Sequence, residues 1–490
     1  MASFLWRKKS INDLMMSSSE TEKGLKRTLS STNLVALGIG AIIGAGLFVR
    51  TAAAAAQNAG PSVTLGFIVA AIGCGLAGLC YAELSSSIPI SGSAYTYSYA
   101  TMGEFIAWII GWDLILEYAV GAATVGIAWS EYLNNLLVNV LHWQAIPYQW
   151  CHSPFEMSTT GIHGMVNLPA FIIVALLSLL LIKGTQESSL VNGIIVVAKV
   201  AIVIMIIVLG WGFINVENHT PYIPPSSTYV DSQNISHNFG GFWGVIGAAG
   251  VVFFAFIGFD AVSTAAQEAK NPSKDMPIGI LGSLVICTIL YILFAHVLTG
   301  IGTVEDFRTN GKEASVAFVI HKYMIGYDWL AQLVTIAILA GFSSVILVML
   351  LGQSRVFYSM SLDGLLPKAL GEIHPKYKTP YKANLFILVI VGLFAAFIPG
   401  DIVGDMTSIG TLFAFMLVCA GVIILRKTNP ELPRKFKTPF VPFVPILGIL
   451  VCFLMILGLG WTNWLRLGVW LLIGLVIYFT YSKNNSKLNK

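Results

Sequence analysis

Long apolar runs separated by short polar breaks fill most of the 490-residue chain. Each run approaches or exceeds the ~20 residues that an α-helix needs to cross the hydrocarbon core of a bilayer. The breaks divide the chain into twelve such runs, at about 33–56, 62–86, 104–138, 166–184, 190–214, 240–268, 278–302, 329–361, 384–400, 403–426, 441–460 and 464–482. The third, sixth and eighth runs are longer than a span requires, so these helices are expected to tilt or to project. The pattern predicts an all-α membrane protein with twelve transmembrane helices.

The composition supports this class and excludes others. Hydrophobic residues make up 56% of the chain and charged residues only 11%, whereas a soluble domain has about 25% charged residues. So few charges cannot cover the surface of a soluble protein of this size, and the main partner is therefore the lipid bilayer. A nucleic-acid partner is excluded because the net charge is only +4 and the basic residues lie between apolar runs.

The positions of lysine and arginine predict the orientation of the chain in the membrane. If the N-terminal segment 1–32 is cytoplasmic, most of the 28 basic residues fall on the cytoplasmic side, and the outer loops 139–165 and 215–239 contain none of them. The even number of spans then places the tail 483–490 on the same side. We therefore expect a multi-pass protein of the cell membrane with both termini cytoplasmic.

The first and sixth runs are each interrupted by residues that disfavour a continuous helix. The first has four glycines between Gly38 and Gly46, and the sixth has a weaker break at 253–260. Each break lies at the head of a block of five runs, at 33–214 and at 240–426. Paired breaks of this kind are typical of inverted-repeat transporters, in which they form a substrate site at the bilayer midplane. The alternative is that the glycines only allow close helix packing.

Unwinding at these positions would expose backbone groups of opposite polarity. A half-helix that begins near Gly46 presents the N–H groups of Ala45 and Gly46, which suit a carboxylate. A half-helix that ends near Phe254 presents the carbonyls of Phe254, Ala255 and Ile257, which suit an ammonium group. A ligand that carries both groups a few ångströms apart is an α-amino acid.

Four motifs resemble those of the amino acid/polyamine/organocation transporter superfamily, and within it the bacterial relatives of cationic amino acid transporters. They are GIGAIIGAGLFV at 38–49, SGSAYTYSYATMGEFIAWIIGWDLILEY at 91–118, FFAFIGFDAVSTAAQEAKNPSKDMPIGI at 253–280 and GFSSVILVMLLGQSRVFYSMSLDGLLP at 341–367. The resemblance implies the LeuT-type fold of five plus five inverted repeats, with helices 1 and 6 broken and two further helices at 441–482. It also implies transport of L-amino acids, commonly with proton symport.

The resemblance also implies a set of substrate-binding residues. Relatives often have a hydroxyl residue where this chain has Ala45, so here the backbone amides are expected to hold the carboxylate, and the ring of Phe254 is expected to act as a gate. Met349 aligns where cationic relatives have a smaller residue, which favours small or medium neutral amino acids, unless the side chain faces lipid or core instead. The full set is Ile42, Gly44, Ala45, Gly46, Phe254, Ala255, Ile257 and Met349.

Lys199 is the most unexpected charge within a span, since ionisable residues there are costly and usually functional. By the family pattern its ammonium group reaches the carbonyls of Gly40 and Ile43, where sodium-driven relatives of this fold place a cation. Lys199 would then make sodium unnecessary. The alternative is a lysine that extends to the membrane surface.

Three of the acidic residues within spans are candidates for a special role. Asp113 and Glu117 lie four apart on the third run, on one helical face. Glu117 resembles a residue of the family's proton-coupling network, whereas Asp113 is interpreted as an interfacial residue. Asp260 directly follows the sixth-run break, where it caps the inner half-helix, pairs with Glu117 or Lys199 in proton movement, or does both.

These observations lead to one main functional hypothesis, a proton-coupled and sodium-independent L-amino acid symporter that works by alternating access and accepts cationic substrates less readily. The alternative is an amino acid or polyamine exchanger of the same fold. An enzyme is not expected because HExxH and GxSxG motifs and clustered metal ligands are missing from the sequence. We expect no metal and no cofactor other than protons as the coupling ion. The resemblance leaves room for a small accessory membrane subunit, and for a monomer or a weak oligomer.

Overall fold

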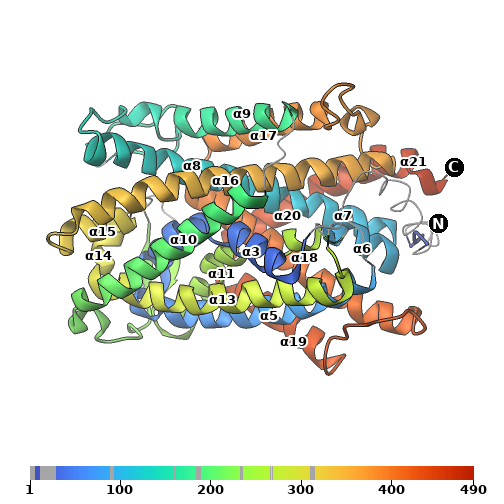
Figure 1. Ribbon diagram of the computed structural model, residues 1–490, viewed down its shortest axis with the longest axis horizontal. Helices are drawn as coiled ribbons and strands as arrows, with labels where there is room; N and C mark the ends of the chain where they lie inside the picture. The colour runs from blue at the N-terminus through green and yellow to red at the C-terminus, as the bar shows by residue number, and fades with distance from the viewer. Residues whose placement is uncertain are drawn as a thin grey trace.

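The structure is a computed structural model that describes most of the chain. It describes residues 6–10, 29–88, 93–158, 160–183, 189–231, 236–264, 266, 269–309 and 315–489. Helices cover every one of the twelve predicted runs (Figure 1). In the described ranges, eight helical stretches are long and apolar enough to cross a membrane, and four apolar helices are shorter. The prediction of a mainly helical membrane protein is confirmed.

Most runs form one continuous helix. These are α5 (Val63–Ser87), α9 (Leu168–Lys183), α10 (Ser189–Gly210), α13 (Pro272–Ile301), α16 (Asp328–Leu362), α17 (Tyr381–Phe397), α18 (Gly400–Thr428), α19 (Phe443–Gly458) and α20 (Trp461–Ile477). The third run is a longer helix with π-type turns, made of α7 (Glu104–Ile115), η5 (Leu116–Val120), α8 (Gly121–Asn135) and η6 (Leu136–Val140).

Short helices connect these spans or extend them. They are η4 (Gly60–Ser62), α6 (Ser93–Thr101), η7 (Tyr148–Trp150), η8 (Trp211–Phe213), η9 (Val216–His219), α14 (Val304–Thr309), α15 (Ser315–Tyr323), η11 (Lys368–Gly371), η12 (Tyr478–Ser482), α21 (Lys483–Asn485) and η13 (Lys487–Asn489). The loop between α10 and α11 also contains an antiparallel hairpin of β1 (Ser227–Val230) and β2 (Ser236–Phe239). This hairpin is a small departure from the all-α prediction, and it forms where threonine, tyrosine, valine and phenylalanine favour strands.

The first and sixth runs are the broken ones. The first consists of α3 (Ser31–Ile42), η2 (Gly46–Arg50), α4 (Thr51–Ala54) and η3 (Ala55–Ala59), and the sixth of α11 (Gly241–Val252), η10 (Phe253–Phe256) and α12 (Ala261–Thr264). Gly258 has φ +113°, and a Cβ atom there would lie 2.9 Å from the carbonyl oxygen of Ala41. Only glycine fits both that conformation and that space. The predicted interruption of helices 1 and 6 is therefore present.

The helices pack along the long axis of the molecule. Helices α9 and α17 pack together on one long side and α5 and α13 on the other, with α16 between them (Figure 1). Helix α13 also packs on α3, so the first broken helix is held against a continuous one. Residues 38–42 of α3 and 246–252 of α11 are buried, so the parts of both helices next to the breaks are covered by protein.

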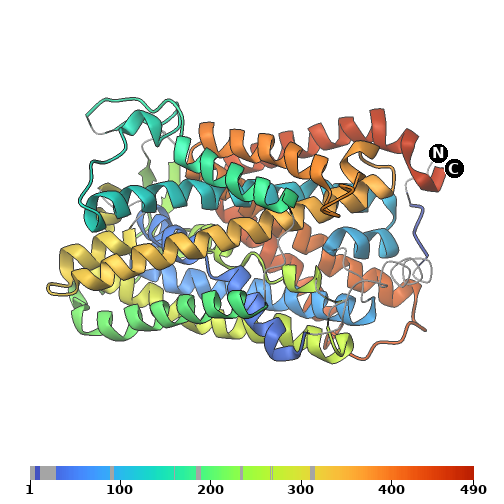
Figure 2. The same cartoon turned by 45° about the horizontal axis from the view of Figure 1, so that its top comes forward.

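The two ends of the long axis carry different elements. Helices α14 and α15 lie at one end and α6 and α21 at the other, and Figure 2 shows the same separation after rotation. At the second end Lys9 forms an ion pair with Asp363. Glu104 there accepts hydrogen bonds from the hydroxyl groups of Tyr99, at 2.9 Å, and of Ser486. The described parts of both termini are thus bound to the same end of the helix bundle.

A compact loop covers the opposite end of the third run. The imidazole of His152 forms an ion pair with Glu131 of α8, with 2.9 Å between Nε2 and Oε1, and its ring stacks on Tyr148. Burial opposes the charged form of His152, but hydrogen bonds to Cys151 and Glu131 outweigh it and raise the pKa of His152 to about 11. His152 therefore stays cationic at neutral pH and anchors the loop.

Replacing His152 tests this anchor. A raised folded-state pKa stabilises the fold fully below the unfolded value near 6.5, and the stabilisation is lost as pH rises toward 11. We expect His152→Gln to lower the melting temperature in detergent by roughly 1–3 °C at pH 6. The difference from the unsubstituted protein should shrink as pH rises. Exposed His163 provides the control, since His163→Gln should change little at any pH. A pH-independent effect of His152→Gln would contradict the ion pair.

Candidate functional site

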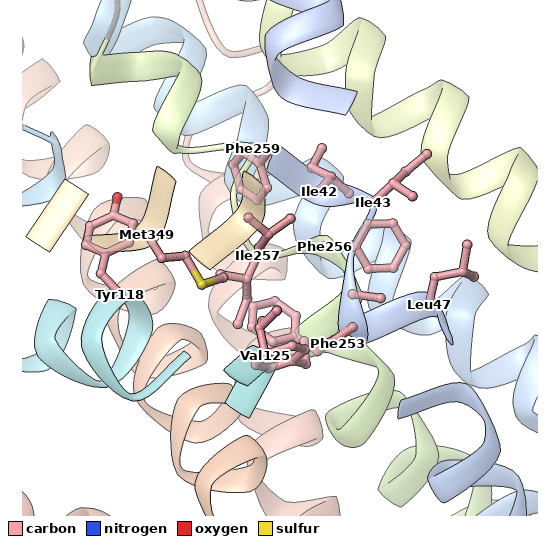
Figure 3. Packing of buried hydrophobic residues seen from close by; sticks show 14 of the residues in the cluster. Ile42, Ile43, Leu47, Tyr118, Val125, Phe253, Phe256, Ile257, Phe259 and Met349 are labelled. Carbon is pink, nitrogen blue, oxygen red and sulfur yellow. The ribbon is translucent and has the colours of Figure 1, made fainter. Parts of the chain in front are cut away.

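The two breaks meet in the interior of the molecule. A Cβ atom added to Gly46 would lie 2.1 Å from the Cα atom of Ala255, so the two backbones touch without an intervening side chain. Ile42 and Ile43 lie at the end of α3 and Ile257 follows η10, and Figure 3 shows them around this meeting point. The structure therefore brings together the two segments that the sequence paired.

At the first break α3 ends and a new helical segment begins. The N–H groups at the start of that segment are not used by the helix itself. The N–H groups of Leu47 and Phe48 both point to the carbonyl oxygen of Gly44, at 3.2 and 3.4 Å. The N–H groups of Ala45 and Gly46 precede them at the start of η2, the position in a helix where N–H groups lack an intrahelical partner. This is the geometry expected of a carboxylate site.

The second break presents carbonyl groups, but two of them already accept a hydrogen bond. The carbonyl of Phe254 accepts the N–H of Ile257 at 3.3 Å, and that of Ala255 accepts the hydroxyl of Tyr291 at 3.0 Å. A carbonyl oxygen has two lone pairs, so each can still accept a bond from an ammonium group. Phe254 is buried, with 3% of its surface exposed, and its role as a gate stays a prediction.

Tyr291 of α13 was not identified from the sequence. Its hydroxyl lies 3.0 Å from the carbonyl oxygens of both Ile42 and Ala255, so one side chain connects the two breaks. It is fully buried and its ring packs on Phe67 and Phe256. A tyrosine in the middle of an apolar run is a usable signal, because a buried hydroxyl needs a partner.

The space beside the breaks is lined by apolar side chains. Met349 is buried, and its Sδ atom would lie 3.3 Å from a Cβ atom added to Gly121. Figure 3 shows the Met349 side chain beside Ile257, with Tyr118 and Val125 on the facing segment. The lipid-facing alternative for Met349 is therefore wrong, whereas its burial in the hydrophobic cluster agrees with the core-facing alternative, and its role in limiting ligand length stays a prediction.

Lys199 reaches the first break, as the family pattern implied. Its Nζ atom donates to the carbonyl oxygen of Gly40 at 3.0 Å and lies 3.5 Å from Oγ of Ser344. Ile43 and Lys199 line the same small cavity. Only 4% of Lys199 is exposed, so the alternative of a lysine that extends to the membrane surface is wrong. Gly341 makes room for its stem, since a Cβ atom there would lie 2.9 Å from Cε.

The acidic residues of the third and sixth runs interact with one another. The hydroxyl of Tyr118 donates to the carboxylate of Asp260, and Glu117 interacts with the same carboxylate. Asp260 also interacts with the N–H of Ala261 at the start of α12. The capping role and the pairing with Glu117 are therefore compatible. Asp113 is fully buried, so its interpretation as an interfacial residue is wrong: the inner end of the third run is covered by protein.

Arg50, in the first run, is buried with 2% of its surface exposed. It forms ion pairs with Asp401 at 3.3 Å and with Asp405, both on α18. Gly404 allows this approach, because a Cβ atom there would lie 3.0 Å from the guanidinium carbon. Arg50 therefore connects the second segment of the first broken helix to α18. The i, i+4 spacing of the two aspartates is the sequence signal for a shared cation.

Comparison with known proteins places this geometry in a family context. The chain matches the family model described as amino acid permease over residues 29–480. It is 45% identical to the branched-chain amino acid permease BcaP of Bacillus subtilis (strain 168), with 100% of both chains covered. It is 39% identical to the methylthioribose transporter of the same organism, again with 100% of both chains covered.

A plant relative supports the predicted link to cationic amino acid transporters. The vacuolar cationic amino acid transporter 4 of Arabidopsis thaliana is 28% identical, with 99% of this chain and 96% of the relative covered. These relatives are permeases and transporters rather than enzymes, as the sequence predicted.

Replacing Gly46 tests the contact between the breaks. Gly46→Ala puts a methyl group into the backbone of Ala255, and overpacking of this kind costs ~1–3 kcal/mol. We expect substrate uptake into proteoliposomes to fall by about tenfold or more. Gly75→Ala is the matched control, because a Cβ atom at Gly75 meets nothing within 4 Å. Equal uptake by both variants would contradict the contact.

Proposed function

Because the chain belongs to the amino acid permease family, we propose that it carries neutral L-amino acids of small or medium size, branched-chain ones included, across the cell membrane. In this proposal the chain has twelve spans, and the segments 1–32 and 483–490 are cytoplasmic. The blocks 33–214 and 240–426 are inverted repeats that alternate access to one site, and 441–482 adds the last two spans.

One observation carries the proposal: the two helix breaks meet beside an apolar wall. The N–H groups at Ala45 and Gly46 suit a carboxylate, and the carbonyls at Phe254, Ala255 and Ile257 suit an ammonium group. A zwitterion with an apolar side chain satisfies both ends and the wall. Methylthioribose, the substrate named for one relative, is a sugar without these charges and would leave the backbone groups unpaired.

Sodium independence follows from the position of Lys199. Its ammonium group supplies a positive charge at the carbonyl oxygen of Gly40, at 3.0 Å. A sodium ion placed there would be repelled by that charge and would lose the carbonyl ligand. We infer that the Lys199 ammonium group takes the place of the cation that sodium-driven relatives of this fold bind. Protons then remain as the coupling ion.

Glu117 and Asp260 are the proposed proton carriers. Both side chains are fully buried and they interact with each other. Two adjacent carboxylates far from water repel each other, so binding of one proton relieves the repulsion. Asp260 directly precedes α12, the inner half of the sixth helix, so a change of its charge acts on a segment next to the substrate.

Transport by purified protein in proteoliposomes tests the function. We expect leucine to accumulate without sodium and without internal substrate when the outside is made acidic, because protons that enter drive the substrate with them. Collapse of the proton gradient with an ionophore should abolish accumulation. Uptake that requires internal amino acid would support the exchanger alternative instead. Absence of leucine uptake under both conditions would contradict the proposal.

Shortening Met349 tests the choice of neutral substrates. Met349→Ser shortens a side chain of the apolar wall and so leaves room for a longer substrate side chain. We therefore expect arginine or lysine uptake to rise relative to leucine by ~10-fold or more. Competition between labelled leucine and each cationic amino acid measures the ratio. Met406→Ser, a partly buried methionine of α18 outside the described site, serves as the control. An unchanged ratio in Met349→Ser would place Met349 outside the pocket.

A further inference from the structure

Buried polar side chains form a group around Glu117 and Asp260, and its other members have no role in the function proposed above. We call it the inner polar cluster, and it consists of Tyr81, Tyr97, Asp113, Glu117, Asp260 and Ser263. No member exposes more than 1% of its surface. Each has at least one side-chain oxygen that makes no hydrogen bond to any described residue.

Electrostatic contacts connect the members into one network. Tyr81 of α5 interacts with Asp260, Glu117 and Tyr97. Tyr97 of α6 faces Asp260 and Ser263 of α12. Glu117 interacts with Asp260 and also with Asp113, one turn earlier on the same helix. The polar groups thus converge from four different segments rather than from one helix.

Asp113, like Glu117, is a member whose carboxylate has no hydrogen-bond partner among the described residues. Neither of its carboxylate oxygens makes a hydrogen bond to a described residue, and Oδ1 would lie 3.2 Å from a Cβ atom added to Gly410. A buried polar group without a partner costs free energy, so such groups in proteins are usually satisfied by water or serve a function. An unpartnered carboxyl group in a membrane protein is the most costly case.

No described cation compensates Asp113. The elements packed against α7 are α6, η5, α16, α18 and α20. Helix α6 has no charged residue, Arg355 of α16 is exposed, and Arg466 of α20 bonds to Asn463. On α18, Arg426 pairs with Glu83 near the inner end, Lys427 is exposed, and the two aspartates pair with Arg50. Glu117 interacts electrostatically with Asp113. Among the described residues of these elements none supplies a cation to Asp113, so a proton can compensate its charge.

Asp113 lies to one defined side of the Glu117 and Asp260 pair along the third run. The third run begins at Glu104, which binds the C-terminal tail, and Asp113 lies between Glu104 and Glu117. If the tail is cytoplasmic, Asp113 lies on the cytoplasmic side of the Glu117 and Asp260 pair. The tyrosines and Ser263 supply hydroxyl groups that can pass a proton along hydrogen bonds.

We propose that Asp113 is a third proton-carrying carboxyl group, which takes the transported proton from Glu117 and releases it to the cytoplasm. In this step the O–H bond of the Glu117 carboxylic acid breaks and an O–H bond forms on the Asp113 carboxylate, directly or through hydroxyl groups of the inner polar cluster. Asp113 then gives the proton to cytoplasmic water. The inference rests on the proposed proton coupling and adds to it the residue through which protons leave.

Asp113→Asn tests the proposal, because the amide keeps the shape of the side chain but cannot carry a proton. We expect proton-driven leucine accumulation and leucine-dependent acidification of the vesicle lumen to fall by about tenfold or more. Exchange of internal for external leucine, which needs no net proton release, should stay within about twofold of the unsubstituted protein. Asp113→Glu should restore part of the accumulation and shift its pH profile.

Ser130→Ala is the matched control, since Ser130 of α8 is also buried with an unpartnered hydroxyl but lies outside the cluster. It should leave accumulation unchanged. Normal accumulation by Asp113→Asn would overturn the proposal. So would an equal loss of exchange and accumulation in a folded Asp113→Asn protein, which indicates a structural role. If Asp113→Asn does not fold, an unshifted pH profile in Asp113→Glu overturns it. Absence of lumen acidification in the unsubstituted protein would instead contradict the proposed proton coupling itself.

Discussion

The close approach of two interrupted helices is the interaction on which the rest of the structure depends. Backbone polar groups inside a bilayer are tolerated only where protein covers them. Gly46 and Ala255 touch, Gly258 lies against Ala41, and the hydroxyl of Tyr291 lies within 3.0 Å of two of the released carbonyls. Helices α5 and α18 pack on η10, and α11 and α15 pack on η2, so protein covers this contact. The proposed substrate site lies there because backbone groups at the breaks keep hydrogen-bonding capacity.

The buried charged residues are subject to the same requirement, because protein must also cover and pair them. Buried charges of the broken helices bind neighbouring helices: Arg50 forms ion pairs with α18, and Asp260 accepts a hydrogen bond from Tyr118 of the third run. Lys199 holds the break itself through Gly40. These charges are buried and hydrogen-bonded, which is the condition under which a bilayer protein can keep them.

Much of this arrangement was predictable from sequence because it follows local rules. The lengths of the apolar runs predicted the helices. The density of glycines predicted the first break, and the position of the second block of five runs predicted the second break. Lys199 and Met349 could be placed through the family resemblance. Partners across the fold could not be predicted this way. Tyr291 and the Arg50 pairs depend on which helices become neighbours, and Asp113 was misplaced because sequence position alone does not show that protein, rather than the membrane interface, surrounds it.

The central claim is that the meeting point of the two breaks recognises both charged ends of an amino acid. Ligand-dependent thermal stabilisation of the purified protein measures this directly, because a ligand that binds only the folded state raises the melting temperature. Leucine should stabilise the protein, whereas leucine methyl ester, N-acetyl-leucine and methylthioribose at the same concentration should not. Stabilisation by any of these three equal to that by leucine would contradict recognition of the zwitterion.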